Sequence, residues 1–187
     1  DTVHSFTLIA DSVIHGTFQE LKDEKRLDVN LLAGTSRSFI FGLEMMHEMA
    51  EKNELTPVMV VHLGTNGIIR PKRFDRMMKL LSKQELVLFI NVRVNKRWES
   101  QVNEVLAEGV KRYPNAELLD WHSHSKGQDA WFRPDKTHLS LEGNQAMTKF
   151  LLAGLDEMER LSLGACLESD DAVDVFTEKQ NIEEHLD

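Results

Sequence analysis

Short apolar runs alternate with longer segments of helical periodicity, and this alternation constrains the fold more than any other feature of the sequence. Five runs rich in Val, Leu, Ile and Phe are almost continuously apolar, as expected of strands covered on both faces of a sheet. The expected strands are residues 5–10, 28–33, 57–63, 85–92 and 116–120. The expected helices are residues 13–25, 37–52, 72–82, 97–113 and 141–160. This alternation predicts an α/β fold, a three-layer α/β/α sandwich around a five-stranded parallel sheet.

The length and the distribution of charge suggest one catalytic domain and a tail. A chain of 187 residues is long enough for one domain with a sizeable core. Residues 161–187 hold eight acidic residues and one lysine, so they contribute −7 to the net charge of −9. We therefore expect a catalytic domain over residues 1–162 and an acidic C-terminal tail over residues 163–187, either a surface helix or a mobile extension.

Composition also argues against several classes of protein. Residues 1–160 carry a net charge of only −2 and no basic stripe, so we expect no nucleic-acid partner. The single cysteine, Cys166, allows no intrachain disulfide. The longest apolar runs are far shorter than the roughly 20 residues that span a bilayer. Because the chain begins almost inside its first expected strand, without a signal peptide, we expect a domain excised or processed from a longer protein.

The first candidate for chemistry is the turn at Asp11 and Ser12, which leads the first expected strand into a helical stretch. A serine at such a turn lies beside backbone amides that have no helical partner, a setting that favours developing negative charge. Ser12 is therefore a candidate nucleophile, and its backbone amide a candidate oxyanion donor. Asp and Ser are also ordinary helix caps, so this block alone leaves both interpretations open.

The second candidate is the segment HLGTNG at residues 62–67, which follows the third expected strand. Its two glycines permit a tight backbone path, and the side-chain amide of Asn66 can donate to an oxyanion. The alternative is a glycine-rich turn with Asn66 in a left-handed conformation. Both interpretations stay open for this block alone.

The third candidate is the pair Asp135 and His138, in a loop before the last expected helix. A catalytic triad needs an imidazole base whose other nitrogen is held by a carboxylate, and this spacing supplies both from one loop. The alternative is that His138 simply precedes a helix capped by Ser140. In a parallel sheet the catalytic loops gather beyond the carboxyl ends of the strands, so we expect the three blocks to meet there.

In this order, the three blocks resemble those of the SGNH (GDSL-like) hydrolases. The resemblance covers nearly all of residues 5–155 and points most to the extracytoplasmic SGNH domain of membrane-bound peptidoglycan O-acetyltransferases. The segments that carry it are residues 28–39, 60–67, 91–106 and 131–139. The chain differs from the pattern at Ala10, where the family usually has Gly, and at Gly67, where hydrolases often have Asp.

The resemblance implies a flavodoxin-like SGNH hydrolase fold and a catalytic triad of Ser12, His138 and Asp135. It implies an oxyanion site formed by Ser12, Asn66 and Gly34, and a reaction that needs no cofactor. The implied activity is transfer of an acetyl group to the C6 hydroxyl of muramic acid in cell-wall glycan, at the extracellular face of the bacterial cell membrane. The implied partners are an acyl donor, a glycan acceptor and a membrane acyltransferase domain upstream of this segment.

Two other functions stay open for this sequence. One is a secreted carbohydrate acetylesterase with the same triad, in which water accepts the acyl group. The other is a catalytically silent glycan-binding module, because a fold alone never proves activity.

Further residues beside the expected site are candidates for binding. Trp98 and Trp131 can each stack on a sugar ring, and packing in the core is an equally open alternative. Arg93 follows the fourth expected strand, where it can hold an anionic or carbonyl group of the substrate or pair with a surface acid. His122 and His124 are potential zinc ligands, but a His-x-His pair in a polar loop is typical of solvated side chains, so we expect no metal.

Overall fold

The core of the fold is a single five-stranded parallel sheet. A computed structural model describes the backbone of residues 2–183 and the side chains of residues 2–166. The strand order is β2-β1-β3-β4-β5, which is that of a flavodoxin-like doubly wound sheet. The strands are β1 (His4–Ala10), β2 (Leu27–Ala33), β3 (Val58–His62), β4 (Leu86–Ile90) and β5 (Ala116–Leu119). The predicted three-layer α/β/α fold and all five predicted strands are confirmed.

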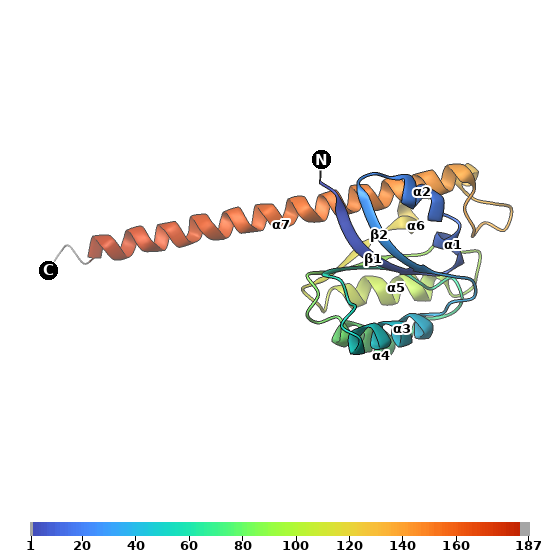
Figure 1. Ribbon diagram of the computed structural model, residues 1–187, viewed down its shortest axis with the longest axis horizontal. Coiled ribbons are helices and arrows are strands. Elements are labelled where there is room, and N and C mark those ends of the chain that lie inside the picture. The colour runs from blue at the N-terminus through green and yellow to red at the C-terminus, as the bar shows by residue number, and fades with distance from the viewer. Residues whose placement is uncertain (1, 184–187) are drawn as a thin grey trace. The chain divides into compact units, whose positions relative to one another are not determined.

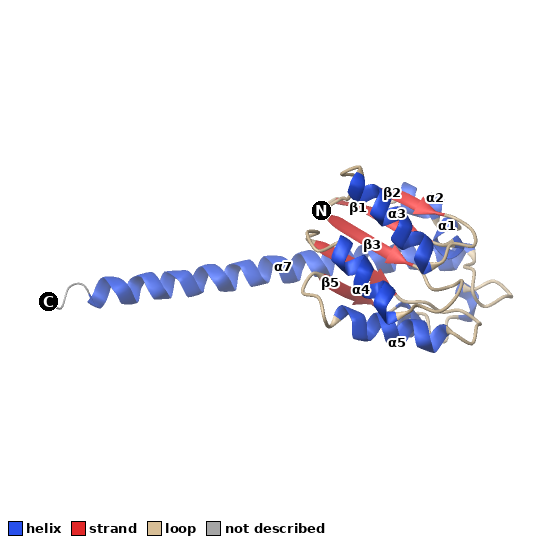
Figure 2. Cartoon of the chain, turned by 90° about the horizontal axis from the view of Figure 1, so that it is seen from below, coloured by secondary structure: helices blue, strands red, loops and turns tan. Residues whose placement is uncertain are grey.

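Helices cover both faces of the sheet (Figures 1 and 2). One face is covered by α3 (Phe39–Glu51), α4 (Pro71–Leu80) and α5 (Glu99–Val110). The other face is covered by α1 (Ser12–His15), α2 (Phe18–Asp23) and the first turns of α7 (Leu141–Glu183). Two further short helices, α6 (Trp121–His124) and η1 (Asp129–Trp131), lie between β5 and α7 and were not predicted.

Alternate residues of the central strands are buried on opposite faces of the sheet. Ile9 and Val61 belong to the hydrophobic cluster that β1 and β3 form with α3, α4 and α5. Leu8 and Val60 are equally buried but lie outside that cluster, because successive side chains of a strand point to opposite faces. Buried apolar side chains therefore lie on both faces of these strands, which is why they form nearly continuous apolar runs in the sequence.

The helix predicted over residues 13–25 is in fact two helices, which separate at Gly16 and Thr17. The amide of Asn144, in the first turns of α7, donates to the backbone oxygen of Gly16 at 3.0 Å. The hydroxyl of Thr17 donates to the side-chain oxygen of Asn144 at 3.1 Å. The break is thus held by a residue far away in the sequence, which local periodicity could not reveal.

The last helix, α7, continues beyond its predicted end at residue 160 and runs to Glu183. No proline or glycine follows Gly164, so nothing in the sequence stops the helix. The chain forms two units, Asp1–Leu152 and Ala153–Asp187. The predicted boundary near residue 162 stays a prediction, and the side chains of most of the acidic tail, from residue 167 on, lie outside the described residues. None of the described helices has the length and apolar character needed to cross a membrane.

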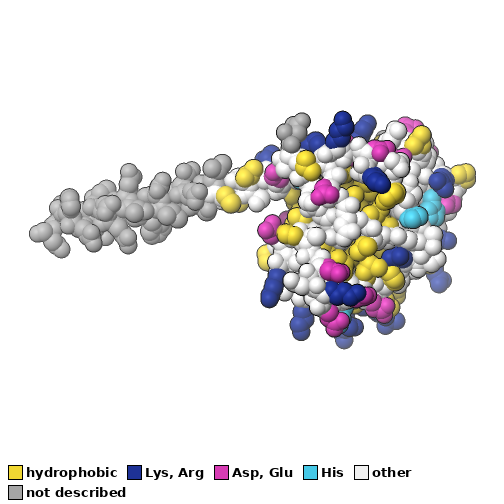
Figure 3. All heavy atoms as spheres, viewed as in Figure 1, with side chains coloured by type: hydrophobic (Ala, Val, Ile, Leu, Met, Phe, Trp, Pro, Cys, Tyr) yellow, Lys and Arg dark blue, Asp and Glu magenta, His cyan; other side chains and the backbone are white. Residues whose placement is uncertain are grey.

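Basic and acidic side chains are interspersed on the face of the domain that Figure 3 shows. One ionic contact connects α4 to the segment after α5. Asp75 accepts a hydrogen bond from the hydroxyl of Tyr113 at 2.7 Å and one from Arg112 at 2.6 Å. Together these bonds lower the pKa of the Asp75 carboxyl, the Tyr113 bond more than the Arg112 bond.

The close approach of α5 to α4 depends on Gly109, and we expect Gly109→Ala to destabilise the fold. A Cβ at this position would lie 2.5 Å from the ring of Phe74, which is fully buried and packs against Phe89 in a tilted arrangement with ring centroids 4.8 Å apart. The predicted loss of unfolding free energy is about 1–3 kcal/mol, measurable by denaturant titration. Gly164→Ala is the control, since a Cβ there meets nothing within 4 Å. An equal effect of both changes would contradict this account of the helix packing.

Candidate active site

The sheet leaves a natural place for a site where its strand order reverses. From β1 the chain crosses to β2 on one side, whereas β3 pairs with β1 on the other side, so the loops after β1 and β3 diverge. Such a divergence forms a crevice at the carboxyl ends of the strands. The last residues of the two strands, Ala10 and His62, are register partners. Ser12 and Asn66 therefore follow neighbouring strand ends, as the sequence predicted.

The side chain of Asp11 joins these two loops. It is fully buried, and its Oδ1 accepts the backbone N–H of Val13 at 3.1 Å, which caps the N-terminus of α1. Its Oδ2 accepts the backbone N–H of Thr65, in the loop after β3, at 3.3 Å. Asp11 thereby holds Ser12 at the first position of α1, where a backbone N–H has no partner within the helix.

The structure brings Ser12, His138 and Asp135 into one chain of hydrogen-bond contacts. Ser12 Oγ lies 2.9 Å from His138 Nε2. His138 Nδ1 lies 2.6 Å from Asp135 Oδ2. Ser12 and His138 are 126 positions apart, and the fold alone brings them together.

The protonation of this chain follows from the chemistry of its groups. An ionised carboxylate only accepts hydrogen bonds, so His138 Nδ1 carries the hydrogen that faces Asp135, and Nε2 is left to accept the hydroxyl of Ser12. Partial burial raises the pKa of Asp135. Hydrogen bonds from His138 and from the backbone of Thr137 together lower this pKa by more than burial raises it, so the net pKa is below its usual value. Asp135 is therefore ionised at neutral pH.

The loop that carries Asp135 and His138 is held by local contacts. Oδ1 of Asp135 accepts the backbone N–H of His138 at 2.9 Å and that of Thr137 at 3.0 Å. The backbone of Phe132 pairs with that of Leu139 in an isolated bridge and closes the loop. The imidazole is thus oriented by its own sequence neighbours, and its Nε2 is presented to Ser12.

Asn66 and Gly34, the other predicted oxyanion residues, lie in two loops that touch each other. Asn66 is exposed, and its amide donates to the backbone oxygen of Arg37 at 2.9 Å. Gly34 follows β2 directly, and a Cβ there would lie 2.5 Å from Nε of Arg37, so the arginine packs on the glycine. An amide nitrogen has two hydrogens, so Asn66 can donate one more bond. Among the described residues, no hydrogen bond joins either residue to Ser12.

Trp98 is half-buried, and its indole N–H donates to the backbone oxygen of Thr65 at 3.3 Å. The peptide groups on both sides of Thr65 are therefore held, the N–H by Asp11 and the oxygen by Trp98. This contact favours packing and positioning over sugar stacking for Trp98. It also connects α5 to the loop that carries Asn66.

Arg93 and Trp131 are engaged with other parts of the protein. The guanidinium of Arg93 donates to the hydroxyl of Ser125 at 2.8 Å and to the backbone oxygen of His122, so it braces the segment around α6. Trp131 stacks on the buried Trp121 with ring centroids 5.6 Å apart and an interplanar angle of 15°. The stacking on Trp121 therefore favours the packing alternative for Trp131. Arg93 also lines a cavity, which is described below.

The two histidines of the His-x-His pair have separate surroundings. His122 Nε2 lies 3.0 Å from Oε1 of Glu99. His124 stacks on Phe150 with ring centroids 4.5 Å apart. Within the part of the chain that the structure describes, neither histidine belongs to a group of three or more potential metal ligands.

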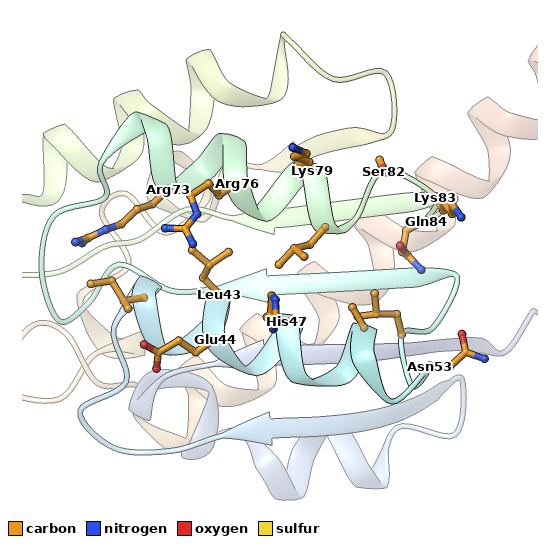
Figure 4. Close-up of a pocket in the computed structure, with 14 residues that line it drawn as sticks. Leu43, Glu44, His47, Asn53, Arg73, Arg76, Lys79, Ser82, Lys83 and Gln84 are labelled. Carbon is orange, nitrogen blue, oxygen red and sulfur yellow. The ribbon is translucent and has the colours of Figure 1, made fainter.

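Two cavities differ in their relation to the site. A cavity of about 560 Å³, here called the loop cavity, lies between the segment after β4 and residues 132–136, and Arg93, Glu99, Arg133 and Lys136 are among its lining residues. A larger cavity of about 940 Å³ lies between α3 and α4, with His47 on one wall and Arg76 on the other (Figure 4). None of the predicted site residues lines the larger cavity, so its size does not make it the site.

Sequence reasoning named Asp11 only as a possible helix cap, a role that the structure shows, and gave no role to Thr65 or Arg37. Asp11 carried a usable signal, because an acidic residue between an apolar strand and a candidate nucleophile is a natural helix cap. The sequence carried no signal for the hydrogen bonds of Thr65 and of the Arg37 backbone, since their partners lie in segments that follow other strands. The buried Thr65 Oγ1 and Arg37 Nη1 are the only buried side-chain polar atoms in the described residues without a hydrogen-bond partner.

Comparison with known proteins agrees with this architecture. No family model matches the chain. The chain is 28% identical over 155 residues to YrhL, named as a candidate peptidoglycan O-acetyltransferase of Bacillus subtilis, covering 83% of this chain and 24% of that protein. It is 34% identical over 98 residues to the peptidoglycan O-acetyltransferase OatA of Listeria monocytogenes, covering 52% of this chain and 15% of that protein. The chain thus spans a quarter or less of the length of these relatives.

Solved structures share the fold at low sequence identity. The C-terminal catalytic domain of the peptidoglycan O-acetyltransferase OatA of Streptococcus pneumoniae matches with a TM-score of 0.73 at 18% identity, covering 86% of this chain and 97% of that one. A lipase/acylhydrolase of Enterococcus faecalis matches with a TM-score of 0.63 at 14% identity, covering 83% and 97%. The resemblance predicted from the three sequence blocks is confirmed: this is a domain with the SGNH hydrolase fold, similar in sequence to peptidoglycan O-acetyltransferases.

Proposed function

We propose that this chain is an O-acetyltransferase that transfers an acetyl group to a hydroxyl of cell-wall glycan, the C6 hydroxyl of muramic acid, through an acyl intermediate on Ser12. The observation that carries the proposal is the contact chain from Ser12 through His138 to Asp135, on a fold shared with a peptidoglycan O-acetyltransferase domain. Sequence similarity to proteins named for that activity supports the choice of substrate.

In the first half of the reaction, His138 Nε2 takes the proton of the Ser12 hydroxyl while Ser12 Oγ bonds to the carbonyl carbon of an acetyl donor. Asp135 keeps the imidazole in the required tautomer and stabilises the imidazolium that forms. The donor's leaving group departs with the proton from His138. The product is acetyl-Ser12.

The negative charge that develops on the carbonyl oxygen needs donors at the crevice. We assign this role to the backbone N–H of Ser12 and the side-chain amide of Asn66, with Gly34 as a third donor. Asp11 and Trp98 support Asn66 indirectly, because both hold the peptide groups of the preceding Thr65.

In the second half, the oxygen of a sugar hydroxyl bonds to the acetyl carbon while His138 takes its proton. The bond between Ser12 Oγ and the acetyl carbon then breaks, and His138 gives that proton to Ser12 Oγ. The three residues that the sequence suggested for substrate binding have different surroundings. Arg93 reaches the loop cavity, whereas the contacts of Trp98 and Trp131 support a structural role more than stacking on a sugar.

The chain corresponds to a part of the longer relatives. We propose that it acts on the extracellular face of the bacterial cell membrane, next to a membrane acyltransferase domain that supplies the acetyl group. The resemblance of the sequence to extracytoplasmic SGNH domains supports this placement. The chain needs no cofactor in this mechanism, because the serine itself carries the acyl group.

Replacement of Ser12 or His138 by Ala should abolish turnover of a small acetyl ester, because each change removes a partner of the proton transfer. We expect kcat to fall by a factor on the order of 10³ or more. Intact-mass spectrometry after incubation with an activated acetyl ester should show one acetyl group on the wild type and none on Ser12→Ala. Ser82→Ala, on an exposed serine before β4 at the opposite sheet edge, is the control. Wild-type activity in Ser12→Ala would contradict the role of Ser12 as nucleophile, whereas a wild type with neither turnover nor acylation would favour a silent glycan-binding module.

The oxyanion assignment predicts that Asn66→Ala lowers kcat by about 10²- to 10³-fold. Trp98→Phe keeps an aromatic ring but removes the N–H that holds Thr65, so we expect a smaller loss of kcat on a small ester without a sugar, at nearly unchanged KM. Steady-state kinetics of both variants test this. A change in KM alone would reassign Asn66 to binding, and a loss by Trp98→Phe that appears only with sugar acceptors would restore its stacking role.

The choice between transferase and acetylesterase depends on which nucleophile reaches acetyl-Ser12. A glycan hydroxyl held in line competes with water through its effective concentration, so transfer should need a matched acceptor. With an activated acetyl donor and muramoyl glycan, we expect acetylated sugar by mass spectrometry. Free acetate as the sole product at saturating acceptor, together with efficient deacetylation of acetylated glycan, would identify a carbohydrate acetylesterase instead.

A further inference from the structure

Residues 70–83 form a strongly basic segment within a domain of low net charge. They hold six cationic residues and one acidic residue, Asp75, whereas residues 1–160 as a whole carry a net charge of −2. The cationic residues are Arg70, Lys72, Arg73, Arg76, Lys79 and Lys83. This segment is a basic stripe that the low net charge conceals, contrary to our expectation from the sequence.

Four of these cations line the larger cavity between α3 and α4 (Figure 4). Arg73, Arg76 and Lys79 recur at every third position of α4, so they are neighbours on one side of the helix. Lys83 follows beyond the end of the helix. The lining runs from the first turn of α3 to residues beyond its end, so the four cations form a row along one wall of the cavity.

This row of cations has no anionic partner within the described part of the chain. None of the four side chains takes part in an ion pair or a side-chain hydrogen bond there. The nearby Asp75 accepts hydrogen bonds from Tyr113 and Arg112 instead. Glu44 is the one carboxylate among the lining residues. Like charges three positions apart on a helix repel each other, so the row costs stability unless an anion offsets it.

We infer that the larger cavity binds a linear phosphodiester polymer, at a place separate from the proposed catalytic residues. Guanidinium and ammonium groups are the side chains that bind phosphate oxygens, and a row of them suits a chain of phosphates. Leu43, Leu55 and Leu80 also line the cavity and provide an apolar surface for the carbon chain between the phosphates. The site goes beyond the proposed function, because it depends on no chemistry at Ser12.

Other anionic partners fit this cavity less well. An extended acidic peptide needs partners for its backbone N–H and C=O groups, but two of the walls are helices whose backbone groups are bonded internally. A membrane surface takes up exposed apolar side chains, and none of the large exposed hydrophobic residues in the described chain lines the cavity. Single-stranded nucleic acid stacks its bases on aromatic side chains, and the lining residues include no Phe, Tyr or Trp.

Direct binding to the wild-type chain tests this inference without any measurement of activity. Calorimetric titration compares a synthetic glycerol phosphate oligomer, its uncharged methyl triester, an oligoglutamate of the same charge and vesicles of phosphatidylglycerol. We expect the phosphate oligomer to bind and the triester not to bind. Four neutralised phosphates predict that the affinity falls by about 50-fold between about 50 and 200 mM salt.

Equal or tighter binding of the oligoglutamate would overturn the inference in favour of an acidic peptide. Binding to vesicles without binding to the phosphate oligomer would overturn it in favour of a membrane surface. Binding of none of the four probes, or equal binding of the triester, would remove the site altogether.

Substitutions in the cavity should change the affinity for the phosphate oligomer according to their charge. Arg76→Gln and Lys79→Gln should each weaken binding about two- to fivefold, as for solvated ionic contacts. Glu44→Gln should strengthen binding by a similar factor, because it removes the opposing charge. Lys72→Gln is the matched control, since Lys72 is exposed on the same helix but does not line the cavity.

The same loss from Lys72→Gln as from Lys79→Gln would overturn the inference, because binding would then follow overall charge rather than the cavity. These variants should keep wild-type turnover of a small acetyl ester, since none of the predicted site residues lines this cavity. A wild type that binds the phosphate oligomer but forms no acetyl-serine would contradict the proposed function and support the binding site.

Discussion

The buried side chain of Asp11 is the contact on which the geometry of the site depends. Its two oxygens accept N–H groups of Val13 and Thr65, so one carboxyl group satisfies a helix N-terminus and the loop of the neighbouring strand. A buried polar group that loses such a partner costs about 1–3 kcal/mol, so the two loops cannot separate cheaply. The distance between Ser12 and Asn66 is therefore set by a residue that has no need to touch the substrate.

Much of the fold and the proposed triad could be predicted because both depend on patterns that are local in the sequence. A strand buried on both faces is a continuous apolar run, and a parallel sheet brings the carboxyl ends of its strands to one edge. Asp135 and His138 were predictable as a pair because three positions in one loop suffice to bring carboxylate and imidazole together. The contact of His138 with Ser12 then needed only the strand order, which the alternation of strands and helices constrains.

The remaining features depend on partners that the sequence does not mark. The residues near Gly16 do not indicate that the helix predicted over residues 13–25 is interrupted there, because the interruption is stabilised by a hydrogen bond from the distant Asn144. The sequence left sugar stacking and core packing equally open for Trp98, because the contact that favours packing is made with the backbone oxygen of Thr65, 33 positions away. Every residue has a backbone oxygen, so residue types do not show which oxygen will accept a hydrogen bond. Contacts of this kind could not be predicted from the sequence.

The exposure of the proposed catalytic groups determines how transfer can compete with hydrolysis. The side chains of His138 and Asp135 are 36% and 50% exposed, so this side of the site is open to water. A site that does not exclude water can favour a sugar hydroxyl only by holding it close to the acyl carbon. Acceptor binding must therefore come from residues outside the triad, such as those of the loop cavity. Substitutions there should shift the partition between transfer and hydrolysis while the formation of acetyl-Ser12 continues.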